Sequence, residues 1–402
     1  MKRSSLASAL AAAALVLAGL ATALPSASAA PSSTGALHAR RVCTATPAAG
    51  HATCFAKVLV NHKGVVPNSS TPASSAKTPT QLRSAYKLTN ASATAGSGKT
   101  VAIVDAYGYP GLESDLSVYR QYFGLSPCTT SNGCLRIVDQ NGGSNLPRTD
   151  SGWDEEQALD VDAVSAICPN CHILVVQANT ASFANLGTAV ITASKQAGVV
   201  AISNSYGGSD APDSTYGHYY NHAGIAVTAS TGDNGYQGGS YPASSSYVTA
   251  VGGTTLKAAS NTRGWTETAW SGAGSGCSTY NAALAAAASY NTGCSKRAMA
   301  DVSAAADPNN GGMAVYYPAS RKRSTWAQVG GTSESSPIIA SVYALSGNTA
   351  GYANAIPYGN ASALFDVTSG SNGSCSPTQW CHARTGWDGP TGLGTPNGTG
   401  AF

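Results

Sequence analysis

The sequence predicts an α/β fold built around a doubly wound, mainly parallel sheet flanked by helices. Short apolar runs rich in Val, Ile and Ala alternate with longer segments of helical period after residue 78. Strands that are apolar on both faces and separated by helices are typical of parallel sheets. The 45 glycines and 19 prolines follow no triplet period, so they exclude collagen and indicate many tight turns and surface loops.

Each expected element follows from its own pattern. The expected strands are residues 100–105, 173–178, 199–203 and 225–229, and the expected helices are residues 112–123, 151–167 and 183–196. In open parallel sheets, functional groups gather where the strands end. We therefore expect loops 203–208 and 230–235 to border the functional site.

The first 29 residues have the features of a secretory signal. Lys2 and Arg3 precede an apolar run over residues 6–20, and Ala27-Ser28-Ala29 is typical of a cleavage site. The run is too short to span a bilayer, and no later stretch reaches about 18 uninterrupted apolar residues. We therefore expect a secreted, extracellular protein without a membrane span.

Charge is distributed unevenly along the chain. Residues 1–77 hold seven of the 22 basic residues and no acidic one, whereas residues 78–402 hold the other 15 and all 19 acidic residues. Residues 30–77 are therefore either a short basic propeptide attracted to an acidic body or an incidental linker. The Ser, Thr and Pro content of residues 65–80 is typical of a linker. We expect the main domain to cover residues 78–402.

Nucleic-acid binding is not expected. In the main domain only Arg321-Lys322-Arg323 clusters basic charge, and this triplet predicts a solvated loop rather than a nucleic-acid footprint.

The ten cysteines fall into close neighbours, which are Cys43/Cys54, Cys128/Cys134, Cys168/Cys171, Cys277/Cys294 and Cys375/Cys381. In an exported chain this spacing suggests five local disulfides, although spacing does not fix the connectivity. Cys168-Pro-Asn-Cys171 could instead be a redox or zinc half-site, but no second such pair follows it.

The expected helix 151–167 is rich in carboxylates. Glu156 and Asp160 are its carboxylate pair at i,i+4, so they share one face. Like charges so placed destabilise a helix by about 0.2 to 0.5 kcal/mol. The pair either lies on a solvated face, belongs to a calcium-binding acidic cluster, or shares a proton in a functional site.

Ser333 is a second candidate, in a Gly-Gly-Thr-Ser-Glu-Ser-Ser-Pro segment that precedes an apolar run. The pattern predicts a junction between a loop and a helix, with Pro337 in the first turn. Ser333 is then either a plain N-cap or a nucleophile whose hydroxyl lies at the positive end of the helix.

Asp233 is a third candidate, in the segment Ser-Thr-Gly-Asp-Asn-Gly after an apolar strand. Asp in such a turn ordinarily forms an Asx-turn, but a protonated Asp can donate a hydrogen bond to an oxyanion. None of the seven histidines lies in a pattern typical of a base for a serine nucleophile. The carboxylate pair is therefore considered in this role.

Seven blocks of the chain, taken together, resemble one family. They are ExxLDxD at 156–162 with AICPNCHI, SNSYGG at 203–208, STGDNG at 230–235, YPASSSYVTAVGGT at 241–254, ADVSAAADP at 300–308, GGTSESSP at 330–337, and LFDVTSG with GWDGPTGLGTP near the end. In this order and spacing they closely resemble the sedolisins, or serine-carboxyl peptidases. The resemblance implies a subtilisin-like fold.

The resemblance also implies a role for each candidate. Ser333 is expected to be the nucleophile, Glu156 the general base and then acid, Asp160 the carboxylate that orients Glu156 and shares its proton, and Asp233 the oxyanion donor. Asp105 ends a strand similar to the aspartate strand of subtilisins, but the resemblance gives it no place in the triad.

One structural Ca²⁺ site is implied by the same resemblance. Its ligands are expected to be Asp366, the Val367 carbonyl, Asp388 and backbone carbonyls near Arg384 and Gly386, and hard oxygen ligands of this kind suit calcium. The family usually has glycine in place of Arg384. Sedolisins also generally carry a long folded prodomain, whereas only residues 30–77 precede the main domain here.

We therefore expect a secreted, monomeric zymogen that hydrolyses protein or peptide substrates at acidic pH. Asp233 must be protonated and Glu156 partly ionised, which predicts a bell-shaped pH profile on the acid side of neutrality. A catalytically silent member of the same fold that binds peptides or cell-surface material is the alternative. A glycosidase is disfavoured, because Glu156 and Asp160 lie one helical turn apart instead of flanking a substrate.

Overall fold

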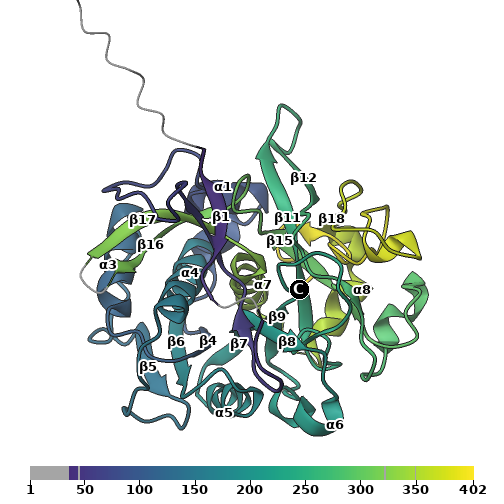
Figure 1. The fold of residues 1–402 in the computed structure, drawn as a ribbon, viewed down its shortest axis with the longest axis horizontal. Coiled ribbons are helices and arrows are strands. Elements are labelled where there is room, and N and C mark those ends of the chain that lie inside the picture. Colours follow the sequence, from purple (N-terminus) through teal and green to yellow (C-terminus); the bar gives the residue numbers. More distant parts are fainter. Residues whose placement is uncertain (1–35, 44–45, 321–322, 349) are drawn as a thin grey trace, which may run out of the picture. The chain divides into compact units, whose positions relative to one another are not determined.

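The computed structural model describes residues 36–43, 46–320, 323–348 and 350–402 (Figure 1). The expected signal over residues 1–29 lies outside the described residues, as do Arg321 and Lys322 of the basic triplet. Within the described ranges, no helix has both the length and the apolar character needed to cross a membrane.

The expected parallel sheet forms the centre of the fold (Figure 1). Its strand order is β12-β11-β9-β7-β4-β6-β5, and β15 pairs with β11 beside this path. The bounds are β4 Thr100–Ala106, β5 Leu135–Asp139, β6 His172–Ala178, β7 Val199–Asn204, β9 Ala226–Ser230, β11 Thr249–Ala258, β12 Trp265–Ala269 and β15 Val302–Ala305. The neighbours pair in parallel except for β11 with β12, so the predicted fold class is confirmed.

Helices cover both faces of this sheet. They are α3 Leu112–Tyr122, α4 Ser151–Ile167, α5 Phe183–Ser194 and α7 Thr332–Ser346. Along β4, Val101 and Ile103 pack in the core that contains α4 and α7, whereas Ala102 and Val104 pack in the core that contains α5. Successive side chains of a strand point to opposite faces, so an uninterrupted apolar run supplies both cores.

The segment before residue 78 pairs with the body instead of standing apart from it. β1 His38–Arg41, β3 Lys57–Val60, β17 Arg323–Gly330 and β16 Met313–Ser320 form one sheet in this order. β2 Thr53–Cys54 pairs with β8 Tyr206–Ser209, whose other neighbour is β10 Ser240–Tyr241. Residues 206–208 of the expected loop 203–208 therefore belong to a strand. In residues 65–80, expected to be a linker, Val66 and Ala76 are buried.

Helix α1 begins beside the expected domain start. Thr78 accepts a hydrogen bond from the Gln81 amide while the Gln81 side chain accepts one from the Thr78 amide, and Pro79 occupies the first helical position. The remaining α-helices and strands are α1 Pro79–Ala85, α2 Thr89–Thr94, α6 Asp213–Tyr216, α8 Ile356–Gly359, β13 Gly276–Cys277, β14 Ala298–Met299, β18 Leu364–Phe365 and β19 Thr395–Pro396.

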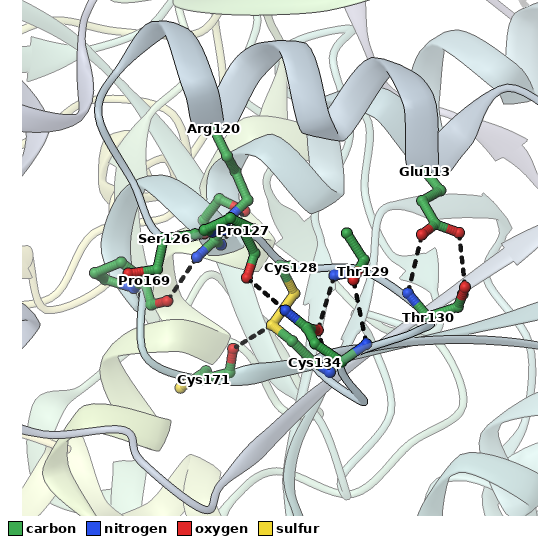
Figure 2. The surroundings of a disulfide bond; sticks show 12 residues. Glu113, Arg120, Ser126, Pro127, Cys128, Thr129, Thr130, Cys134, Pro169 and Cys171 are labelled. Carbon is green, nitrogen blue, oxygen red and sulfur yellow. Dashed lines mark hydrogen bonds between the residues drawn. A yellow bond between two sulfur atoms is a disulfide. The ribbon is translucent and has the colours of Figure 1, made fainter.

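All five close cysteine pairs form disulfides, as suggested by their spacing. Cys168 is bridged to Cys171, so this pair is not a zinc half-site. Figure 2 shows how the loop closed by Cys128–Cys134 docks on α3. The Glu113 carboxylate accepts hydrogen bonds from the Thr130 amide at 3.0 Å and from its hydroxyl at 2.9 Å.

Candidate active site

Helix α4 carries the carboxylate pair into the protein interior. Asp150 caps the helix by accepting from the amides of Gly152 and Trp153. Glu156 and Asp160 are completely buried, so the solvated-face interpretation is wrong. Burial is the main cause that raises the pKa of each carboxyl well above its usual value, and their mutual proximity raises the pKa of Asp160 further.

Asp105, at the end of β4, is a third member of this carboxyl cluster. It is completely buried, and neither of its carboxyl oxygens has a hydrogen-bond partner among the described residues. Burial raises its pKa to about 8, and its charge raises the pKa of both Glu156 and Asp160. Sequence reasoning gave Asp105 no role. The sequence signal for a place in the site was the position of Asp105 at the carboxyl end of a central parallel strand.

Ser333 lies in the first turn of α7, but it is not the N-cap. The N-cap is Gly331, and no side chain caps the helix there. Pro337 lies within the helix, beyond the expected first turn. Because proline has no amide hydrogen, the Ser333 carbonyl is free of its usual helical donor, and the Ser205 hydroxyl lies 3.3 Å from it. The plain N-cap interpretation of Ser333 is therefore wrong.

Ser205 connects the nucleophile candidate to the carboxylate pair. Its hydroxyl donates to Oδ1 of Asp160 at 2.8 Å, and its carbonyl accepts from the Ser333 hydroxyl at 3.1 Å. The Ser333 hydroxyl also lies near enough to Glu156 to lower the pKa of this carboxyl, but its one hydrogen is donated to the Ser205 carbonyl, and Oε1 of Glu156 has no hydrogen-bond partner among the described residues. The three predicted triad residues are thus brought together around one buried hydroxyl.

Asp233 follows β9 and faces the start of α7. Its Oδ1 accepts from the Thr332 amide at 2.8 Å and from the Thr332 hydroxyl at 2.9 Å, so it does not form a local Asx-turn. Its Oδ2 is buried and has no hydrogen-bond partner within the described part of the chain. Burial raises the pKa of Asp233 to about 6, although the positive charge of Lys57 lowers it. A protonated Oδ2 has a free hydrogen to donate.

Residues 53–57 cover this site. The Ser333 hydroxyl accepts a hydrogen bond from the Phe55 amide at 3.1 Å, and Oε2 of Glu156 accepts one from the Ala56 amide at 3.0 Å. Ser333 is completely buried as a result. Phe55 also lines a cleft beside Asp233, together with the glycine-rich segments 207–209 and 231–235.

The expected calcium ligands lie in the loops near the C-terminus. Oδ2 of Asp366 accepts from the Gly386 amide at 2.9 Å, and Oδ2 of Asp388 accepts from the Arg384 amide at 3.1 Å. The two carboxylates are close enough for Asp366 to raise the pKa of Asp388, although burial is the larger cause. The described ranges hold no cluster of three or more His, Cys, Asp or Glu suited to a metal, so any site here depends on backbone carbonyls.

Comparison with known proteins gives related peptidases. Kumamolisin from Bacillus sp. (strain MN-32) is 32% identical over 372 residues, which cover 82% of this chain and 64% of kumamolisin. Sedolisin from Pseudomonas sp. (strain 101) is 32% identical over 174 residues, which cover 39% of this chain and 28% of sedolisin. The chain thus spans less than two thirds of the length of these relatives.

Solved structures agree with the fold. Pseudomonas sedolisin, a serine-carboxyl proteinase complexed with two molecules of pseudo-iodotyrostatin, matches with a TM-score of 0.66 and 25% identity over 80% of this chain and 95% of that chain. The S41 Psychrophilic Protease matches with a TM-score of 0.52 and 18% identity over 81% of this chain and 99% of that chain, a likeness of fold alone. No family model matches the chain.

Proposed function

Because this chain belongs to the sedolisin family of serine-carboxyl peptidases, we propose that it hydrolyses peptide bonds through an acyl-enzyme on Ser333. Glu156 is the general base and then acid, Asp160 orients Glu156 and shares its proton, and Asp233 is the oxyanion donor. The observation that carries this proposal is a pair of hydrogen bonds from consecutive residues. The Phe55 amide donates to the Ser333 hydroxyl and the Ala56 amide donates to Glu156, so the Phe55 carbonyl lies between these two amides in the chain.

In the first step, the Ser333 oxygen attacks the substrate carbonyl carbon and its proton passes to Glu156. The substrate carbonyl oxygen becomes an oxyanion, to which the protonated Oδ2 of Asp233 donates a hydrogen bond. Glu156 then protonates the leaving nitrogen, the carbon–nitrogen bond breaks, and an ester on Ser333 forms. Water hydrolyses this ester, with Glu156 as the base and then the proton returning to Ser333.

The buried environment sets the acid range of this chemistry. Asp233, with a pKa of about 6, donates only while it is protonated, so activity is lost as the pH rises through that value. Glu156 must be partly ionised to accept the Ser333 proton, so activity is also lost at the lowest pH. The carboxyl cluster titrates as a unit, because the charge of Asp105 raises the pKa of Glu156 and of Asp160, and Glu156 raises that of Asp160 further.

Ser333→Ala tests the proposal. We expect the variant to fold and to lose cleavage of a peptide mixture at acidic pH, measured by mass spectrometry. Ser335→Ala is the matched control, because Ser335 lies on the same helix and its hydroxyl donates to the carbonyls of Ala304 and Ala305. Unchanged cleavage by Ser333→Ala contradicts the proposal, and inactivity of the wild-type chain across pH favours the silent peptide-binding alternative.

Residues Asp366 and Asp388, with carbonyls of Val367, Arg384 and Gly386, would hold Ca²⁺ in a structural role. The two neighbouring carboxylates fit a hard cation, which would relieve their mutual repulsion, and their backbone donors show that the loops already converge there. Residues 1–29 would direct secretion, residues 30–77 would act as a short propeptide, and residues 78–402 would form the peptidase domain of a monomer.

A further inference from the structure

Thr332 lies between the glycine N-cap of α7 and the proposed nucleophile, and each of its polar groups is bound at or just after the end of β9. Its amide and its hydroxyl donate to Oδ1 of Asp233 at 2.8 and 2.9 Å. The hydroxyl also accepts from the Gly232 amide at 3.1 Å, and the Thr332 carbonyl accepts from the Ser230 hydroxyl at 2.8 Å. Thr332 is completely buried, so these hydrogen bonds are shielded from water.

The direction of the hydrogen bond from the Thr332 hydroxyl follows from its neighbours. A hydroxyl has one hydrogen to donate, whereas a backbone amide only donates. The Gly232 amide therefore points its hydrogen at the Thr332 oxygen. Among the described residues, Oδ1 of Asp233 is the one acceptor that this hydroxyl bonds, so it receives the hydroxyl hydrogen. The hydrogen bonds thus run from Gly232 through Thr332 to Asp233.

Oδ1 of Asp233 is thereby kept as an acceptor. A proton on Oδ1 would compete with two donors for one oxygen, and the Thr332 amide has no lone pair to receive that proton. Oδ2 is buried and has no hydrogen-bond partner within the described ranges. When Asp233 is neutral, its proton therefore resides on Oδ2.

Oδ2 borders open space at the start of α7. A Cβ on Gly331 would lie 2.7 Å from Oδ2, so this oxygen faces the room that the glycine leaves free. Gly331 has a φ of +101°, a conformation that side chains disfavour. It is the N-cap of α7 and precedes Ser333 by two positions. The Oδ2 hydrogen is therefore available beside the nucleophile, where the substrate oxyanion would form.

We propose that Thr332 is a positioning residue that keeps the Asp233 proton on Oδ2 and sets the upper pH limit at which Asp233 serves as the oxyanion donor. This inference rests on the proposed peptidase function and deepens it. Thr332 acts through Asp233 and not on the substrate. The donor is oriented before the substrate binds, so it needs no rearrangement when the oxyanion forms.

The same hydrogen bonds act on the ionisation of Asp233. Burial, the largest cause, raises the pKa of Asp233 to about 6, and both Thr332 hydrogen bonds lower it. They do so because a donor binds an ionised carboxylate more strongly than a neutral carboxyl group. Thr332 therefore orients the proton but also lowers the pH at which that proton is lost.

Three other charged or titratable groups act on the same carboxyl or respond to it. The Lys57 ammonium of β3 lies 4.0 Å from Oδ2, and Arg41 of β1 lowers the pKa of Asp233 slightly further. The charge of Asp233 in turn raises the pKa of Glu156 on α4. All three groups stay in place when the Thr332 hydroxyl alone is removed, so a substitution at Thr332 isolates its hydrogen bond.

Thr332→Val tests the proposal, because it keeps the branched shape and the amide but removes the hydroxyl. The alkaline limb of kcat for peptide cleavage should move up by about one pH unit, since the ionised carboxylate loses a donor. Thr332→Ala should move the limb in the same direction, and Thr332→Ser should restore it. Thr228→Val is the matched control, since the buried Thr228 hydroxyl bonds Ser336 of α7 and no carboxylate. A limb that stays in place in both Thr332→Val and Thr332→Ala overturns the proposal.

Asp233→Asn separates orientation from ionisation. The Thr332 donors should hold the amide oxygen in the place of Oδ1 and the amide nitrogen in the place of Oδ2, which reproduces the protonated carboxyl. Because this donor does not titrate, adding Thr332→Val should leave the alkaline limb where it is in Asp233→Asn. A limb that moves as far in the double variant as in Thr332→Val alone contradicts the proposed route through Asp233.

A measurement without catalysis separates this inference from the proposed function. The aspartate carboxyls of Ser333→Ala are titrated by ¹³C NMR, and the Asp233 signal is identified by its absence in Asp233→Asn. Its midpoint should rise by about one pH unit on adding Thr332→Val and return on adding Thr332→Ser. Ser333-dependent peptide cleavage with an unmoved midpoint overturns the inference and leaves the peptidase function standing. A moved midpoint without any Ser333-dependent cleavage removes the peptidase function, and with it the catalytic purpose of Thr332.

Discussion

The Ser205 hydroxyl donates to Oδ1 of Asp160 at 2.8 Å, and no other hydrogen bond reaches the Asp160 carboxyl among the described residues. This donor stabilises the ionised form of a buried carboxyl whose pKa is otherwise raised by burial. We therefore expect Ser205 to be a positioning residue that acts through Asp160.

Ser205→Ala should lower kcat about ten- to hundredfold, the usual effect of losing a hydrogen bond to a charged group. It should also move the acid limb of the pH profile to higher pH, because more of the carboxyl cluster stays protonated. Ser336→Ala is the control, since the Ser336 hydroxyl pairs with the hydroxyls of Ser203 and Thr228 and with no carboxylate. An acid limb that does not move in Ser205→Ala excludes this role.

Asp233 should control the alkaline limb of the profile. Asp233→Asn keeps a donor that does not titrate, so its activity should persist above the pH of about 6 at which Asp233 ionises. Asp233→Ala removes the donor, and kcat should fall about 10²- to 10³-fold. Rate profiles of peptide cleavage from pH 3 to 8 check both. If Asp233→Asn and the wild type lose activity at the same pH, another group sets that limb.

Much of the fold was predictable from the sequence, because buried parallel strands and helices have local periodic signatures. Strand 100–105 and helix 183–196, for example, match β4 and α5 to within two residues. The disulfides were predictable because each bridge joins near neighbours in the chain, and blocks such as GGTSESSP pointed to Ser333.

The remaining features depend on contacts between distant residues. The strand pairing of residues 53–54 with β8 joins segments about 150 positions apart, and no local pattern indicates it. Asp105 joins the carboxyl cluster only because β4 and α4 pack together. Pro337 was misplaced by one turn, since the helix tolerates it where the polar Ser205 hydroxyl lies beside the carbonyl that loses its amide donor.

Asp105 should make the protein less stable as the pH rises. Its pKa is about 8 in the folded chain and about 3.9 when unfolded, so the folded chain holds one more proton between these values. Stability from this group is complete below pH 4 and is lost as the pH rises through about 8. Asp105→Asn should reduce the slope of the unfolding free energy against pH.

Urea unfolding of Ser333→Ala proteins at pH 5, 6 and 7 measures the slope without self-digestion. Asp150→Asn is the matched control, because asparagine caps a helix as well as aspartate does. Equal slopes with and without Asp105 contradict the expected linkage.

Calcium should stabilise the C-terminal loops. A chelator should lower the Tm by about 3 to 5 °C relative to calcium at a hundredfold excess over its Kd, and Asp388→Asn should remove that difference. Asp139→Asn is the control, since Asp139 also accepts hydrogen bonds from loop amides but lies in another part of the fold. A wild-type Tm that is the same with chelator and with calcium rules out the site.

In the proposed mechanism, Glu156 does for Ser333 what a histidine does in other serine peptidases. The most direct test compares kcat of Glu156→Gln and Glu155→Gln on one peptide that the wild type cleaves. Glu155 is a buried neighbour on the same helix whose pKa burial raises to about 8. The proposed mechanism predicts a loss of about 10²- to 10⁴-fold for Glu156→Gln and little change for Glu155→Gln. A Glu156→Gln enzyme with near wild-type kcat would contradict it.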